Sequence, residues 1–539
     1  MLVRRSKFTV HFAFLTLLAA LVGNGGSAAA ATPSPTPTPA AVNVLTFHND
    51  SMRSGLNKLE TVLRPSNVVQ AAFGKLFSYP VDGYLYAEPL YVSQLAIPGQ
   101  GVHNVVYAAS EHDSVYAFDA DDLAPTTLWQ KSFIDPGAGI TTVSPTDVNC
   151  NNLVPEIGIT GTPAISLENQ ALYVVSETKN NNTYVTQLHA LDLATGAEKF
   201  GGPVEISGTV AGTGVGGDGA GHIAFDPMLG LQRAALLLAN GNVYIAFASN
   251  CDQGSYHGWL FAYDALTLAR KAVFNSTPNG SEGGIWQSGN GPSAPPSGYV
   301  FMGIGNGTFN GRTDFGDSYV KLAPNTLKVV DYFTPSNQTT LAALDEDGGI
   351  TGAVLLPTQP YAANPWELVG GIKTGRLYLL RRSPMGGYCQ PCNDSQAVGV
   401  VGTHFPLFDA PAFAFGTLYI GGVGARLRAW QIVNGVLATA AAAWTTTIFD
   451  YPGTTPAVSS DHSAHRIVWA LETSGYASGD PAVLHAYNAY TLDELYNSAQ
   501  AGSRDTAGPA VKFTVPTVAN GKVYVGTQTE LDVYGLLPP

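Results

Sequence analysis

A short pattern of apolar and small residues that ends in an aromatic or aliphatic side chain recurs along the chain. Its clearest copies are residues 115–119, 188–192 and 260–264, and each is followed by turn residues. Five weaker copies follow, at residues 319–322, 377–380, 427–430, 484–487 and 531–534. Short apolar runs between turn signals predict β-strands. The copies return about every 59 residues, which is the spacing of repeated units and not of isolated strands.

Repeated units of short strands at this period indicate a β-propeller of four-stranded antiparallel blades, and eight copies predict eight blades. Hairpin turns such as Asn240-Gly241 and Asn520-Gly521 separate further apolar runs within the units. Residues 73–78 form an expected strand without a blade of its own, and the last unit ends soon after its recurring pattern. We therefore expect an all-β, eight-bladed propeller whose N-terminal strand joins the C-terminal blade and closes the ring. One short helix is expected around residues 66–72.

The start of the chain has a different pattern. Residues 1–30 combine a basic beginning, an apolar run and a stretch of small residues, which predicts a secretory signal peptide. Residues 31–41 are a Thr/Pro-rich linker of extended character, and residues 42–539 are expected to form one propeller domain. No later segment has the roughly 18 apolar residues of a membrane helix. We expect an exported, soluble protein, periplasmic or secreted, without a transmembrane segment.

Composition narrows the choice of partners and cofactors. The net charge is −14, and an acidic chain with 12% charged residues lacks the basic clusters that nucleic acid requires. Four cysteines are present, at positions 150, 251, 389 and 392, and disulfides are their expected state after export. Cys389 and Cys392 have the spacing of a redox or haem motif. Asn393 stands where haem attachment needs a histidine, so no haem is expected.

Two stretches carry a family resemblance. Residues 190–200 read Ala-Leu-Asp-Leu-Ala-Thr-Gly-Ala-Glu-Lys-Phe, which resembles the repeat of pyrroloquinoline quinone (PQQ) propellers with Phe200 in place of Trp. Residues 283–382 contain Gly-Gly-Ile-Trp, Gly-Asn-Gly, Leu-Asp-Glu-Asp and Ile-Lys-Thr-Gly in order. This order resembles the cofactor-bearing half of PQQ-dependent alcohol and sugar dehydrogenases. Related repeats also occur in cofactor-free scaffold propellers, so the resemblance supports fold more than chemistry.

The resemblance implies a set of site residues. Trp286 would stack beneath the quinone, Asp345 would be the general base, and Lys373 would face a quinone oxygen. The metal ligands implied for Ca²⁺ or a lanthanide are Asn306, Asp345, Asp347 and, as the nearest candidate for a Glu ligand, Glu177. The chemistry is coherent, because such a quinone needs an aromatic platform, a hard cation with oxygen ligands and a carboxylate that accepts the alcohol proton.

A structural role stays open for each of these residues. Trp286 could pack between blades, and Asn306 could form a turn between its neighbouring glycines. Asp345 and Asp347 could lie in a solvated loop. Lys373 could belong to a hairpin turn, and Glu177 could lie at a blade edge. The adjacent cysteine pair of many alcohol dehydrogenases is absent, and Leu344 stands where a Trp is expected. Glu88, Glu111 and Glu156 are expected near the channel mouth without an assigned role.

Two main functions remain. The first is a PQQ- and metal-dependent dehydrogenase that oxidises an alcohol or sugar and passes electrons to an external acceptor. The alternative is a cofactor-free propeller that binds a protein or a glycan as a scaffold module, and a hydrolase or lyase on the same frame is a third choice. Convergence of Trp286, Asn306, Asp345 and Lys373 at one channel mouth would favour the dehydrogenase.

Overall fold

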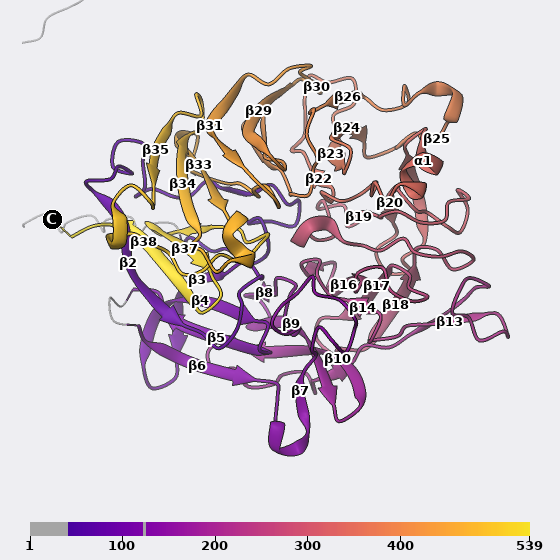
Figure 1. The fold of residues 1–539 in the computed structure, drawn as a ribbon, viewed down its shortest axis with the longest axis horizontal. Helices are drawn as coiled ribbons and strands as arrows, with labels where there is room; N and C mark the ends of the chain where they lie inside the picture. The colour runs from indigo at the N-terminus through magenta and orange to yellow at the C-terminus, as the bar shows by residue number, and fades with distance from the viewer. Residues whose placement is uncertain (1–40, 122–124, 539) are drawn as a thin grey trace, which may run out of the picture. The chain divides into compact units, whose positions relative to one another are not determined.

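The eight recurring patterns form the third strands of eight sheets arranged in a ring (Figure 1). The computed structural model describes residues 41–121 and 125–538. The fold is an eight-bladed β-propeller, as the repeats predict. The expected signal peptide, residues 1–30, and nearly all of the expected linker lie outside the described residues.

The first four blades follow one another along the chain from residue 90. Their strands are β3 (Leu90–Ile97), β4 (Gly101–Ser110), β5 (Ser114–Asp119) and β6 (Thr127–Ser132); β8 (Ala164–Ser166), β9 (Ala171–Asn180), β10 (Thr183–Asp192) and β11 (Val204–Glu205); β15 (Leu237–Ala239), β16 (Asn242–Ser249), β17 (Trp259–Asp264) and β18 (Arg270–Asn275); β19 (Val300–Gly303), β20 (Tyr319–Leu322), β21 (Val329–Thr334) and β25 (Gly387–Tyr388). In the fourth blade the innermost position is held by a bridge from Ser293 to Phe301. Short strands add to this half: β7 (Ile140–Thr142), β14 (Gly230–Leu231), and the pair β12 (Thr209–Ala211) and β13 (His222–Ala224).

The last four blades complete the ring. Their strands are β22 (Val354–Leu355), β23 (Glu367–Ile372), β24 (Arg376–Arg381) and β26 (Gly399–Gly402); β27 (Ala412–Ala414), β28 (Thr417–Ile420), β29 (Ala425–Val433) and β31 (Ala443–Phe449), with β30 (Val436–Leu437) beside β29; β32 (Ala457–Asp461), β33 (Ala464–Glu472), β34 (Val483–Asn488) and β35 (Glu494–Asn497); β36 (Thr517–Ala519), β37 (Lys522–Gly526), β38 (Glu530–Leu536) and β2 (Phe73–Pro80). The helical segments are α1 (Gln338–Ala343), η1 (Pro136–Ala138), η2 (Gln287–Gly289), η3 (Gln390–Cys392), η4 (Ser474–Ala477) and η5 (Gly502–Arg504).

The N-terminal strand closes the ring as predicted. β2 pairs antiparallel with β38, from Phe73 opposite Leu536 to Pro80 opposite Glu530. The final sheet therefore joins strands from both ends of the chain, which removes two exposed sheet edges.

The helix expected around residues 66–72 is wrong, because this segment forms turns. The side chain of Asn67 bonds the backbone that precedes it, accepting from the Arg64 N–H and donating to Val62 O. Such local side-chain bonds compete with a helical ladder and favour turns.

An N-terminal crossing segment, residues 44–57, runs along the inner edge of the ring. β1 (Leu56–Asn57) within it pairs parallel with β32, the innermost strand of the seventh blade. The segment bonds to every blade in order, at Tyr91, Ile165, Leu236, Ala294, Leu355, Phe413, Val458 and Val518. These residues lie in or beside the innermost strands, so one stretch of backbone ties all eight blades together.

Blade packing repeats a single tyrosine contact. Tyr107, Tyr173, Tyr244 and Tyr419 each lie on the second strand of a blade, and each is 2% exposed or less. Their hydroxyls donate to backbone carbonyls just past the third strand of the following blade, namely those of Leu193, Ala265, Pro324 and Ala489. The phenol ring of each tyrosine fills the space between two neighbouring sheets, and its hydroxyl gives a turn carbonyl its hydrogen bond.

All four cysteines are paired, Cys150 with Cys251 and Cys389 with Cys392, as expected. Among the described residues, no helix is both long and apolar enough to cross a membrane.

Candidate functional site

Loops from many blades meet on one face of the ring. The connections into the first strand of a blade and those between its second and third strands lie on the same face, because successive strands run in opposite directions. Arg233 precedes the third blade and Phe513 the eighth, yet the Arg233 guanidinium lies 4.1 Å from the centre of the Phe513 ring. Blades that are not neighbours can touch only near the axis. We call this region the channel mouth; it comprises Tyr86, Arg233, Trp286, Asn306, Asp345, Asp347, Lys373, Phe408, Tyr451, Tyr476, Lys512 and Phe513.

Five of the six site residues expected from the sequence meet there. The Lys373 Nζ, in the turn after β23, lies 3.0 Å from Asp345 Oδ2 and 3.2 Å from Asp347 Oδ2. The backbone N–H of Asn306 donates to Asp347 Oδ1 at 3.0 Å. A Cβ on Gly305 would lie 2.5 Å from Asp347 Oδ1 and 3.1 Å from Trp286 Cδ1. The glycine therefore allows the chain to pass between the acidic loop and the indole.

The two carboxylates of the acidic loop have different environments. The Asp345 side chain is 60% exposed, whereas that of Asp347 is 7% exposed. Burial raises the pKa of Asp347 to about 6, against the opposing charge of Lys373. Burial lowers the pKa of Lys373, but Asp347 and Asp345 outweigh it, so the Lys373 pKa is raised overall. Lys373 therefore carries its positive charge at neutral pH, between one exposed and one buried acid.

Asn306 carries an atom suited to a hard cation. The residue is 7% exposed, and its Oδ1 is buried with no hydrogen-bond partner. Amide oxygens are ligands that Ca²⁺ accepts. Lys373 competes for the neighbouring carboxylates, and no group of three His, Cys, Asp or Glu in residues 41–121 and 125–538 is arranged to hold a metal ion. The assignments of Asn306, Asp345 and Asp347 as metal ligands stay predictions.

Glu177 belongs to a different group of acids. It lies on β9, and its Oε1 accepts the backbone N–H of Gln232 at 2.6 Å. Burial raises the pKa of both Glu177 and Glu111 to about 8, and the charge of each raises the pKa of Asp113. Glu177 as a metal ligand stays a prediction, and a bound cation would have to face these buried acids as well.

Arg233, Lys512 and the rings other than Trp286 at the channel mouth have no signal in the sequence, in contrast to Lys373. Lys512 is 7% exposed, and burial, together with the charge of Arg233, lowers its pKa to about 8. Its Nζ lies 5.1 Å from the Tyr476 ring centre, and the Lys373 Nζ lies 5.6 Å from that of Phe408. Lys512 and Phe513 share one loop, the other residues come from separate loops, and none of them has motif spacing. The one sequence signal that could have identified them is their position, either just before the first strand of a blade or between its second and third strands.

The channel mouth has the charge and the aromatic surface to bind a flat anion. Over the described chain, neither Arg233 nor Lys512 forms an ion pair within 4.0 Å, and the nearby Asp409 is fully buried with a raised pKa. The Phe408, Tyr451 and Phe513 rings follow one another at centroid distances of 5.7 and 6.1 Å. Aromatic faces with unpaired cations among them suit a planar ligand that carries several negative charges.

Comparison with known proteins gives a likeness of fold. No protein-family model matches the chain, and no curated protein matches it. A quinohemoprotein alcohol dehydrogenase from Pseudomonas putida HK5 superimposes with a TM-score of 0.60 at 15% identity, covering 92% of this chain and 80% of that chain. A quinohemoprotein alcohol dehydrogenase from Comamonas testosteroni gives 0.60 at 16%, with the same coverage. A europium-containing methanol dehydrogenase gives 0.60 at 14%, covering 93% of this chain and 99% of that chain.

These similarities confirm the resemblance to PQQ-type propellers at the level of architecture. At identities of 14–16% these similarities support the fold alone, so the chemistry has to be argued from the residues of the site.

Proposed function

We propose that this protein binds PQQ at the channel mouth and oxidises an alcohol or sugar, with the electrons passing to a separate acceptor. The observation that carries the proposal is the convergence of three cations, Arg233, Lys373 and Lys512, with aromatic rings on one face. PQQ is a flat tricyclic quinone with three carboxylates, so it requires both features. Trp286, Asn306, Asp345 and Lys373 meet at the same place, which is the outcome that favours an enzyme over a scaffold.

Each residue has an expected task. Arg233 and Lys512 would bind quinone carboxylates, because neither forms an ion pair within the described residues. Trp286, 9% exposed, would offer its ring as a platform. Asp345, exposed and held by Lys373 at 3.0 Å, would accept the hydroxyl proton of the substrate. PQQ, when bound, supplies the two-electron oxidant for the carbon centre.

A Ca²⁺ or lanthanide ion is expected to use Asn306 Oδ1, the buried oxygen without a partner, with Asp347 beside it. The ion would compete with Lys373 for Asp347. Cation binding is therefore expected to need the bound quinone, whose own oxygens complete the ligand set.

Export is part of the proposal. The signal-peptide pattern of residues 1–30 and two disulfides are typical of a protein in an oxidising compartment.

The test is equilibrium dialysis of the mature protein against PQQ, with Ca²⁺, La³⁺ or neither. We expect one quinone per chain and a Kd raised about tenfold or more in Trp286→Ala and Lys512→Met, because each loses a direct contact. Lys271→Met is the matched control, since Lys271 is exposed and ion-paired with Asp264 away from these loops. Asn306→Ala should weaken binding only when a cation is present.

Turnover separates an enzyme from a quinone-binding scaffold. Asp345→Asn is expected to bind PQQ like wild type and to lose alcohol or sugar oxidation with an artificial electron acceptor. If wild type binds no PQQ under any cation condition, the dehydrogenase is excluded, and a cofactor-free module that binds protein or glycan becomes the better explanation of the fold.

A further inference from the structure

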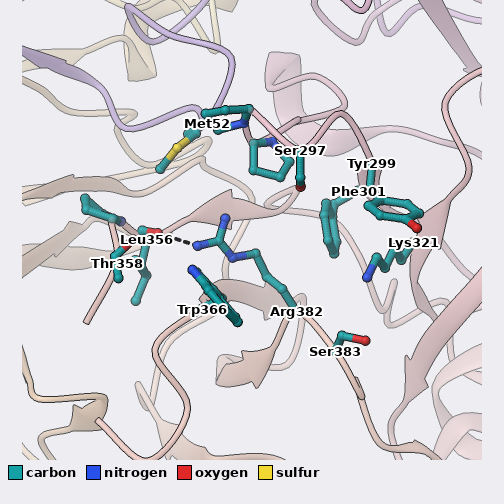
Figure 2. Close-up of a pocket in the computed structure, with 13 residues that line it drawn as sticks. Met52, Ser297, Tyr299, Phe301, Lys321, Leu356, Thr358, Trp366, Arg382 and Ser383 are labelled. Atoms are coloured by element: carbon teal, nitrogen blue, oxygen red, sulfur yellow. Dashed lines mark hydrogen bonds between the residues drawn. The ribbon is translucent and has the colours of Figure 1, made fainter. Parts of the chain in front are cut away.

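A cavity of about 620 Å³ lies between the fourth and fifth blades (Figure 2). Its lining includes Pro295 and Tyr299 from the turn into β19, and Leu356 and Trp366 from the connection between β22 and β23. These turns join the first and second strands of their blades, so they lie on the face opposite the channel mouth. The cavity is therefore a separate place from the proposed quinone site.

Two cations line this cavity. Arg382 follows β24 and is 8% exposed; its Nη2 donates to Leu356 O at 3.1 Å, while its Nε is buried without a hydrogen-bond partner. Lys321, on β20, has its Nζ 4.3 Å from the centre of the Tyr299 ring. Burial and the charge of Arg382 lower the pKa of Lys321. Two like charges held close together in a partly dry site require a compensating anion.

The nearby carboxylates supply only part of that charge, and not at contact distance: burial lowers the pKa of both cations more than Asp331 raises that of Lys321 and Glu367 that of Arg382. Asp331 accepts the backbone N–H groups of Tyr332 and Met385 at 3.0 Å each. Glu367 is fully buried on β23, where a Cβ on Gly435 would lie 2.8 Å from its Oε1, and it does not line the cavity. Within the described chain, neither Lys321 nor Arg382 has a carboxylate within 4.0 Å.

The remaining walls are apolar. Phe301 is 1% exposed and forms the inner wall, while Tyr299 and Trp366 are 37% and 61% exposed at the rim. Met52, from the N-terminal crossing segment, lines the same cavity. In Figure 2 the Tyr299 and Phe301 rings lie beside Lys321, and Trp366 lies beside Arg382. An exposed tryptophan next to a cavity is typical of a ligand-binding rim.

We propose that this cavity binds a small organic acid with an apolar body, and that Lys321 and Arg382 together hold its carboxylate. The apolar body packs against Phe301 and beneath Trp366. The carboxylate accepts from Arg382 Nε, which has no hydrogen-bond partner within the described residues, and gives Lys321 a counter-charge at contact distance. Neutral molecules of the same shape contact the same walls but give neither cation a counter-charge.

The experiment is isothermal titration calorimetry with two probes of matched shape, 2-naphthoate and 2-naphthamide. Wild type is expected to bind the carboxylate about tenfold or more tightly than the amide, the ratio of a charge-assisted contact to a neutral one. Lys321→Met is expected to lower that ratio severalfold, because only Arg382 then holds the carboxylate, while the amide affinity stays the same. Lys328→Met, at an exposed lysine in the next hairpin, is the matched control and should bind both probes like wild type.

Arg382→Met removes the second cation but also the bond to Leu356 O, so its melting curve is compared with that of wild type. Equal affinities for the two probes, no binding of either, or an unchanged ratio in Lys321→Met would each overturn the proposal. PQQ binding at the channel mouth is measured separately, so failure of one site does not decide the other.

Discussion

Replacing Arg53 by methionine should weaken the link between the N-terminal crossing segment and the blades. Arg53 is fully buried, and its guanidinium donates four hydrogen bonds. These reach Pro292 O at 3.1 Å, Thr46 Oγ1 at 2.8 Å, Phe47 O at 3.1 Å and Leu236 O at 2.9 Å. Burial lowers the Arg53 pKa to about 10, so the charge itself is costly in this position.

The expected magnitude follows from these contacts. Four lost bonds at about 1 kcal/mol each give about 4 kcal/mol. Removal of a buried charge returns part of that cost, so we expect a net loss of about 3 kcal/mol. Near 2.1 cal/mol/K of unfolding entropy per residue, a chain of this length shifts by about 3 °C in Tm.

Differential scanning calorimetry measures the shift, and hydrogen exchange shows where it acts. Amides of residues 44–57 should exchange faster in Arg53→Met, while those of β16 and β17 stay protected. Arg64→Met is the control, because Arg64 is exposed and lies outside the crossing segment, and its Tm should move by less than about 1 °C. If the Tm of Arg53→Met equals that of Arg64→Met, the crossing segment does not stabilise the ring of blades.

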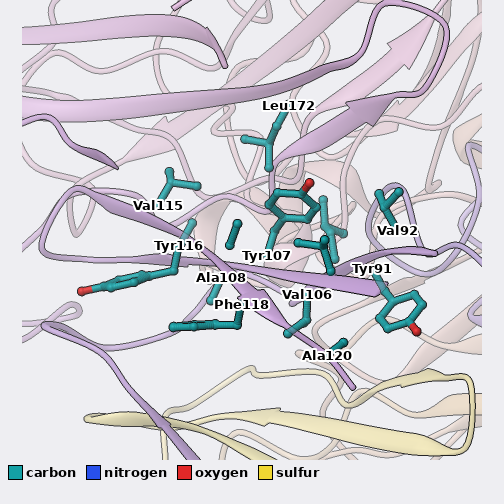
Figure 3. Packing of buried hydrophobic residues seen from close by; sticks show 14 of the residues in the cluster. Tyr91, Val92, Val106, Tyr107, Ala108, Val115, Tyr116, Phe118, Ala120 and Leu172 are labelled. Carbon is teal, nitrogen blue, oxygen red and sulfur yellow. The ribbon is translucent and has the colours of Figure 1, made fainter. Parts of the chain in front are cut away.

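Other substitutions test the core, the buried acids and the longer disulfide. Phe118, in the buried cluster drawn in Figure 3, is 1% exposed, and its ring stacks on that of Tyr79 at a centroid distance of 4.3 Å. Phe118→Ala should therefore cost about 3–5 kcal/mol in denaturant unfolding, against about 0.5 kcal/mol for the exposed Val102→Ala. Glu177 has a folded pKa of about 8 and an ordinary value of 4.5, so it favours the folded state at low pH and loses that contribution as pH rises. Glu177→Gln should therefore gain in Tm relative to wild type between pH 5 and pH 8, and a constant difference would contradict this. Cys150→Ser opens a link across 101 residues and should cost about 2–5 kcal/mol, a difference that must vanish under reducing conditions.

Several features of this fold were predictable because they are local. The recurring apolar pattern forms the third strand in all eight blades, and residues 73–78 supply the strand that closes the ring. Strand alternation and turn residues act over a few neighbours, so they survive as a readable pattern. The helix expected around residues 66–72 fails for a related reason: the Asn67 side chain bonds the backbone of Arg64 and Val62, which hydrophobic periodicity does not register.

The residues of the candidate site were likewise only partly predictable from the sequence. The sequence order of Trp286, Asn306, Asp345 and Lys373 was sufficient to expect them together, and Lys373 does pair with both acids of its loop. Glu177 lies instead with Glu111, in a buried group that no spacing had indicated.

Only the closed ring brings Arg233 within 4.1 Å of the Phe513 ring, and only it brings Arg382 and Lys321 to one cavity. The sequence by itself determined the recurring strands and the number and order of the blades, since these depend on short-range alternation and turns. The tertiary structure decided which single residues from distant loops share a space. Closure of eight blades around one axis sets those distances, and no local pattern encodes them.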